Sequence, residues 1–65
     1  EHYDRMKTWI DDRFQMPNTK VALLIRFLEQ NNSTLSKRAV NKEFQGLTEQ
    51  EVKEIEEMYQ SIVGA

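Results

Sequence analysis

The chain has 65 residues, a formal net charge of −2 and no cysteine. This length suffices for one small domain, and the lack of cysteine excludes disulfide bonds and thiolate metal sites. No apolar run approaches the roughly 20 residues that a membrane-spanning helix needs, so the sequence predicts a cytoplasmic protein without a membrane partner.

Few residues interrupt helices along the chain, which contains two glycines, one proline and no alternating apolar and polar run of strand length. The fold class that we predict is therefore all-α. Residues 1–65 should form a single helical domain, with residues 1–16 as a leading helix and residues 17–65 as the core. Because the chain begins at Glu1 and not at methionine, we expect a fragment of a longer protein.

A first helix is predicted near residues 1–15. Met6, Ile10 and Phe14 recur at helical spacing and therefore lie on one stripe of a helical wheel. Pro17 lacks an amide hydrogen and is disfavoured inside a helix, so it should separate this helix from the next one.

Trp9 lies at the edge of this stripe, close in sequence to Phe14 and Met16. Together these three side chains could present an exposed apolar patch, which is typical of a contact with another domain or a second copy. In the alternative, Trp9 folds over the second helix beside Phe27. No residue pattern specifies an oligomeric state.

The second helix, predicted near residues 18–31, is apolar on two faces. Asn18 or Thr19 should cap its first turn, and Asn31 and Asn32 should end it, because asparagine tolerates the left-handed conformation of a helix end. One face carries Val21, Leu24, Ile25 and Leu28, and nearly the opposite face carries Leu23 and Phe27. A helix with two apolar faces must be covered on both, so we place it between the first helix and the last.

A short third helix is predicted near residues 36–45, with Gly46 as its stop. Thr48 and Glu51 then have the spacing of a capping box, in which each side chain accepts a hydrogen bond from the backbone amide of the other residue. The fourth helix should run near residues 48–63. Its apolar stripe consists of Val52, Ile55, Met58, Tyr59 and Ile62. The whole is a small four-helix domain with a helix-turn-helix or winged-helix-like core.

Lys37, Arg38, Asn41 and Lys42 should lie on one exposed face of the third helix. In a helix-turn-helix protein such a face enters the major groove, where basic side chains contact phosphates and asparagine reads adenine. DNA binding is opposed by the acidic isoelectric point of about 5.3, because DNA-binding domains are usually basic. The same face could instead be attracted to the acidic fourth helix, where residues 48–63 hold five glutamates and one lysine.

No residues have the types and spacing that catalysis or metal binding needs. Asp11 and Asp12 are adjacent, so they would point about 100° apart on a helix. His2 lies close to a chain end that should fray, and Ser36 lacks a neighbouring base and is better explained as a helix cap. We therefore predict no catalytic residue, no metal site and no cofactor.

Three segments stand out between residues 35 and 52: Leu35-Ser36-Lys37-Arg38, Lys42-Glu43-Phe44 and Leu47-Thr48-x-x-Glu51-Val52. Together they resemble the C-terminal end of bacterial proteins of the Fic (filamentation induced by cAMP) family. The resemblance covers roughly residues 17–63. Proteins of that family usually transfer AMP from ATP to a target hydroxyl through a loop reading His-Pro-Phe-x-x-Gly-Asn-Gly-Arg, and this loop does not occur in the chain.

The resemblance implies a non-catalytic regulatory or protein-interaction module of an AMP-transferring enzyme. Its partner would be the remainder of the parent chain or a protein target, with DNA as the alternative. The candidate interdomain contacts are Trp9, Phe14 and Met16, and the candidate contacts to a partner or to nucleic acid are Lys37, Arg38, Asn41 and Lys42.

Overall fold

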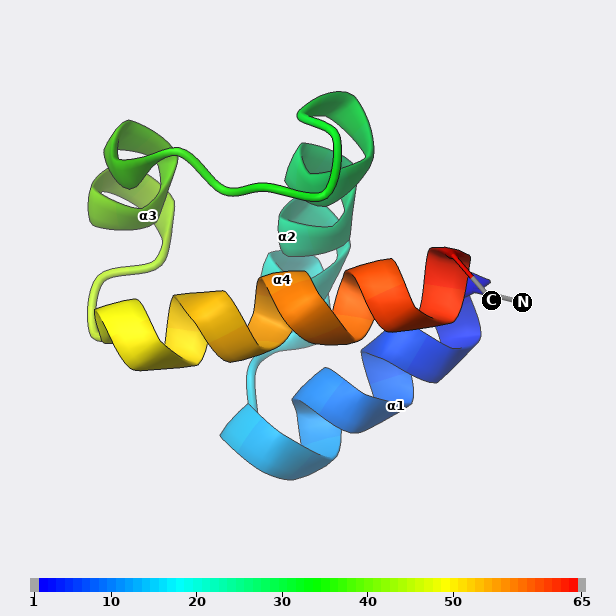
Figure 1. The fold of residues 1–65 in the computed structure, drawn as a ribbon. Coiled ribbons are helices and arrows are strands. Elements are labelled where there is room, and N and C mark those ends of the chain that lie inside the picture. Colours follow the sequence, from blue (N-terminus) through cyan, green and yellow to red (C-terminus); the bar gives the residue numbers. More distant parts are fainter. Residues whose placement is uncertain (1, 65) are drawn as a thin grey trace.

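Four α-helices make up the fold in a computed structural model that describes residues 2–64. They are α1 (His2–Phe14), α2 (Asn18–Gln30), α3 (Lys37–Glu43) and α4 (Glu49–Val63) (Figure 1). The described part of the chain contains no strand, so the predicted all-α fold class is confirmed.

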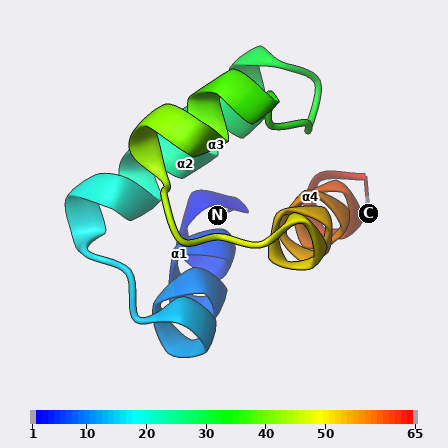
Figure 2. The ribbon, with the colours of Figure 1, turned by 90° about the vertical axis from the view of Figure 1, so that its left-hand side faces the viewer.

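The helix at the centre of the packing is α1, whose backbone lies close to both α2 and α4. Figure 2 views α4 nearly end-on and shows it apart from α2, with α3 joined to it by residues 44–48. The placement of α2 between the first and last helices is therefore wrong. Met6 and Ile10, on one stripe of α1, are fully buried together with Leu24 of α2 and Ile55 of α4, because this stripe faces both neighbouring helices.

The second apolar face of α2 is covered by the residue that follows α3. The ring centroids of Phe27 and Phe44 lie 6.0 Å apart, with the rings perpendicular, which is a favourable edge-to-face geometry. Leu23 and Phe27 are both partly buried against the core. The prediction that both faces of α2 are covered is confirmed in part, because Phe44 covers Phe27, whereas Leu23 also lines a hollow at the surface.

The connection between α1 and α2 differs from the prediction at both ends. Gln15 adopts a left-handed conformation with φ of 53°, and its amide donates to the Asp11 carbonyl over 2.9 Å, so α1 ends at Phe14. Pro17 occupies the N-cap position of α2 without a side-chain hydrogen bond. The predicted cap by Asn18 or Thr19 is therefore wrong, because proline already sets the backbone angle that begins a helix.

The C-terminal end of α2 closes with a backbone motif. Asn32 and Ser33 have φ values of 53° and 67°, and the Ser33 amide donates to the Leu28 carbonyl over 2.8 Å. This is the 6→1 hydrogen bond of a Schellman motif. The left-handed conformation predicted for Asn32 is confirmed, whereas Asn31 has a φ of −119°.

The third helix is shorter than predicted, because it begins at Lys37 and ends at Glu43. Ser36 caps it, with the hydroxyl accepting a hydrogen bond from the Ala39 amide over 3.1 Å. Phe44 leaves the helical conformation and turns its ring into the core, and Gly46 follows with a φ of 105°. The helix therefore ends before Gly46, because Phe44 leaves the helix and packs in the core.

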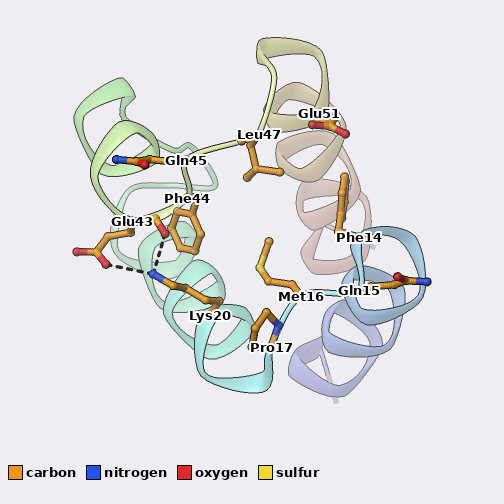
Figure 3. A pocket seen from close by; sticks show the side chains of 11 residues that line it. Phe14, Gln15, Met16, Pro17, Lys20, Glu43, Phe44, Gln45, Leu47 and Glu51 are labelled. Carbon is orange, nitrogen blue, oxygen red and sulfur yellow. Dashed lines mark hydrogen bonds and ion pairs between the residues drawn. The ribbon is translucent and has the colours of Figure 1, made fainter.

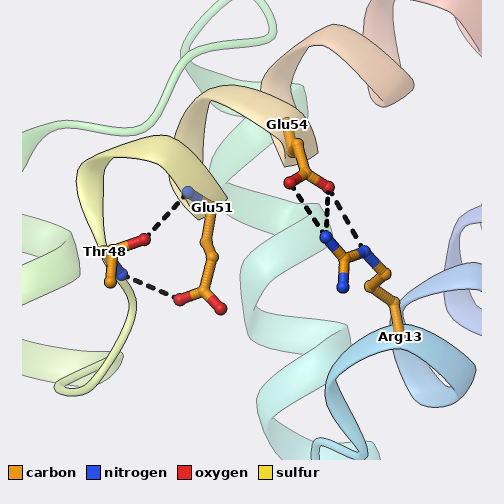
Figure 4. Close-up of polar contacts among 4 residues, drawn as sticks. All are labelled: Arg13, Thr48, Glu51 and Glu54. Atoms are coloured by element: carbon orange, nitrogen blue, oxygen red, sulfur yellow. Dashed lines mark hydrogen bonds and ion pairs between the residues drawn. The ribbon is translucent and has the colours of Figure 1, made fainter.

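The fourth helix begins with the predicted capping box. The Thr48 hydroxyl accepts from the Glu51 amide over 3.1 Å, and the Glu51 carboxylate accepts from the Thr48 amide over 2.9 Å (Figure 4). The helix then continues to Val63, and the amide of Gly64 donates to the Gln60 carbonyl. Both predicted ends of this helix agree with the structure to within one residue.

None of the helices within residues 2–64 has the length and hydrophobicity that a bilayer-spanning helix requires.

Candidate interaction surface

The four polar residues predicted to share a face of α3 are all exposed: Lys37, Arg38, Asn41 and Lys42. Lys37 pairs with Glu49 of α4 at 3.9 Å, and both side chains are about 90% exposed, at 90% and 92%. An ion pair this exposed contributes little to stability. The predicted attraction between α3 and the acidic α4 therefore amounts, among the described residues, to one weak contact.

These four residues divide into two pairs. Lys37 and Asn41 border a groove between α3 and the first turn of α4, which we call the Val40 groove, whereas Arg38 and Lys42 do not line it. The Val40 groove has a volume of about 410 Å³ and is lined by Leu35, Lys37, Val40, Asn41, Leu47, Glu49 and Val52. Its floor is aliphatic, and its rim carries an ammonium, an amide and a carboxylate.

A second groove, which we call the Met16 groove, has a volume of about 390 Å³ and is open to solvent on the other side of Leu47. Figure 3 shows the side chains of Phe14, Met16, Phe44 and Leu47 around it. Two of the three predicted interdomain residues, Phe14 and Met16, thus lie in one groove. Both are half-buried, so they form part of a walled depression and not a bare apolar patch.

Trp9, the third of these residues, lies outside the Met16 groove. Its ring centroid is 5.7 Å from that of Phe14, with the two planes at 80°. It is half-buried and, with Arg13 and Met58, lines a shallow hollow between α1 and α4. The alternative position beside Phe27 is wrong, because the shallow hollow that contains Trp9 lies on the α4 side of α1.

Charged side chains form hydrogen bonds between the helices around these grooves. The Arg13 guanidinium donates to both carboxylate oxygens of Glu54 over 2.9 Å, which joins α1 to α4 (Figure 4). The Lys20 ammonium donates to the Glu43 carbonyl over 2.8 Å (Figure 3). It also lies 5.7 Å from the centroid of the Phe44 ring. Lys20 therefore satisfies a carbonyl at the negative end of the α3 dipole.

A third polar contact fixes the segment that precedes α3. The Glu56 carboxylate of α4 accepts a hydrogen bond from the backbone amide of Leu35 over 2.7 Å, in a partly buried position. Sequence reasoning missed this contact and that of Lys20 because each joins residues more than 20 positions apart. No local spacing signals such a pair, in contrast to the capping residues.

Residues considered for catalysis or metal binding are spread over the surface. Asp11 pairs with Lys7 one helical turn away, at 3.7 Å, and His2 and Asp12 are exposed. Within residues 2–64, no group of three or more His, Asp or Glu side chains is placed to hold a metal ion. Among the described titratable groups, Tyr59 stands out because burial, and secondarily the Glu29 carboxylate, raise the pKa of its phenol.

No family model, curated protein or solved structure matches the chain.

Proposed function

We propose that this chain is a non-catalytic protein-interaction module of a Fic-family AMP-transferring protein, and that its Val40 groove receives another part of that protein. One observation carries the proposal. Residues from the first and third resembling segments come together in this groove, although they are separated in sequence: Leu35 and Lys37 from one, Leu47 and Val52 from the other.

The composition of the groove supports a protein partner. An aliphatic floor within a polar rim is the usual arrangement of a protein–protein contact. Lys37 of α3 and Glu49 of α4 both lie on the rim, are almost fully exposed and pair only weakly. Both charges are therefore available to a partner without the loss of a strong internal contact.

The family assignment is tested by the coding sequence upstream of Glu1. We expect it to encode a catalytic domain that contains the histidine-led, glycine-rich loop of Fic proteins. A parent protein without this loop would contradict the proposal.

The surface assignment is tested by two matched charge reversals, Lys37→Glu and Arg38→Glu. Both positions are exposed and adjacent in α3, but only Lys37 borders the Val40 groove. Binding of the chain to the catalytic domain of its parent, measured by calorimetric titration, should weaken several-fold for Lys37→Glu and stay unchanged for Arg38→Glu. Equal affinities for the two variants would show that the groove is not the contact.

DNA binding remains the second candidate, because all four polar residues of α3 are exposed together. Residues 31–36 connect α2 to α3, which is longer than the turn of about three or four residues in a helix-turn-helix. If DNA binds, Lys37→Glu and Arg38→Glu should weaken it about equally, because phosphate contacts depend on charge. A titration with duplex DNA at low salt that leaves the amide signals of α3 unshifted would exclude this candidate.

A further inference from the structure

We propose that residues 34–45, which comprise α3 and its flanking turns, form a flap that opens while α1, α2 and α4 stay packed. This inference concerns the dynamics of the fold and goes beyond the proposed function, on which it does not depend. Four features of the described residues support it.

The first feature is weak attachment. The closest backbone packing in the molecule joins α1 to α2 and α1 to α4, and does not include α3. The flap contributes Leu35, Val40 and Phe44 to the core, and these keep 8%, 9% and 4% of their surface exposed, whereas Leu24 and Ile55 are at 0%. Segments with fewer buried contacts open at a lower free energy than the rest of a protein.

The second feature is the backbone at the two ends of the flap. On one side, Asn32 and Ser33 have positive φ and the Ser33 amide is bonded to the Leu28 carbonyl, so the closed end of α2 marks where the flap begins. On the other side, Gly46 has a φ of 105°, and a Cβ added to it would meet no atom within 4 Å. Changes of backbone angle at a few such residues are sufficient to move a short element as a unit.

The third feature is a hydrogen bond at each end of the flap from a side chain of another helix, which we call a clasp. Lys20 of α2 holds the Glu43 carbonyl at the end of α3, and Glu56 of α4 holds the Leu35 amide before it. The Lys20 side chain is 43% exposed, so water can replace its contact when the flap moves. The Lys20 contact therefore sets the closed position without locking it.

The fourth feature is what the flap covers. Phe44 packs edge-to-face on Phe27, and Leu35 and Val40 form the floor of the Val40 groove together with Val52 of α4. Opening would separate Phe44 from Phe27 and widen this groove. The flap thus controls how much apolar surface of α2 and α4 is presented to a partner.

Native-state hydrogen exchange of the unmodified chain tests the flap directly. The amides of Val40 and Phe44 donate to carbonyls within and next to α3. The opening free energy of these two amides should depend less on denaturant concentration than that of amides in the buried turns of α2 and α4. If all these amides share one opening free energy and one denaturant dependence, the molecule opens only globally and the proposal is wrong.

Thiol labelling provides a second, independent test, because the chain contains no cysteine. Val40→Cys places a thiol in the flap, and Val21→Cys is the matched control in the fully buried face of α2. Lys20→Met or Glu56→Ala, added to each background, removes one clasp. Loss of such a hydrogen bond should accelerate labelling of the Val40→Cys protein by about three- to tenfold and leave the Val21→Cys protein unchanged.

Two further variants separate the clasps from general destabilisation. Glu56→Gln retains a side-chain oxygen that can accept from the Leu35 amide, so it should label more slowly than Glu56→Ala. Arg13→Met removes the contact between α1 and α4, which lies outside the flap, and should not selectively accelerate the Val40→Cys protein. Equal acceleration of the Val40→Cys and Val21→Cys proteins by the clasp variants would overturn the proposal.

Discussion

Gln15 ends α1 in a backbone conformation that glycine adopts at much lower cost. Its φ of 53° is left-handed, and its amide makes the single hydrogen bond of an αL helix end with the Asp11 carbonyl. Its side chain is exposed. Nothing in the packing therefore requires glutamine at this position.

We predict that Gln15→Gly stabilises the protein. Glycine removes the energetic cost of the left-handed backbone, although its greater freedom in the unfolded chain offsets part of this gain. The unfolding free energy should therefore rise by about 0.5 to 1 kcal/mol. Urea denaturation followed by circular dichroism measures this change. Glycine at Gln45, an exposed position outside any helix, is a suitable control, and an equal or larger gain there would contradict the account of Gln15.

Tyr59 should make stability depend on pH in the alkaline range. Burial, and secondarily Glu29, raise the pKa of its phenol in the folded protein, so folding favours the neutral form. The corresponding stability is fully present below the unfolded pKa of about 10 and is lost as the pH rises through the folded pKa.

We therefore expect the unfolding free energy of the unmodified protein to fall more steeply above pH about 10 than that of Tyr59→Phe. Tyr3→Phe is the matched control, because Tyr3 is exposed and its substitution should leave the steeper fall in place. Denaturation series at several alkaline pH values measure this difference. Identical pH profiles for Tyr59→Phe and the unmodified protein would show that the Tyr59 phenol is not responsible.

At the scale of single helices, local sequence signals predicted the beginnings of α3 and α4 and the left-handed end of α2, but not the cap of α2 or the end of α3. Ser36 and the Thr48–Glu51 pair begin α3 and α4 as expected, because a cap is decided by residues three positions apart. The end of α3 could not be predicted from residues that are close in sequence. It falls at Glu43 because the Phe44 ring packs against Phe27 of another helix, and this tertiary contact has no local pattern.

Thr48→Ala should destabilise the protein by about 1 kcal/mol, because the Glu51 amide loses its side-chain acceptor. Thermal or urea denaturation gives the value. Thr19→Ala is the matched control, since Thr19 is an exposed residue in the first turn of α2 and makes no cap hydrogen bond. An effect of Thr48→Ala no larger than that of Thr19→Ala would contradict a working capping box.

At the scale of the whole molecule, the sequence predicted what must be buried but not which helix provides the cover. The two apolar faces of α2 were both expected to be covered, and the structure buries one face fully and the other in part. The turns at Gln15 and Asn32 determine which helices pack together, because their left-handed backbones change the direction of the chain. The exposure of the candidate site residues on α3 could be expected from helical periodicity. The two grooves could not, because both depend on the position of Leu47, which lines each of them.

The most direct test of the central claim, that a two-faced α2 is covered by α1 on one side and by Phe44 on the other, is a nuclear Overhauser experiment on the isotope-labelled chain. We predict ring-to-ring cross-peaks between Phe27 and Phe44, together with methyl cross-peaks from α2 to α1, all within one molecule. A sample that mixes labelled and unlabelled chains identifies any contacts between molecules. Absence of the Phe27–Phe44 cross-peaks, or their appearance only between molecules, would contradict the account.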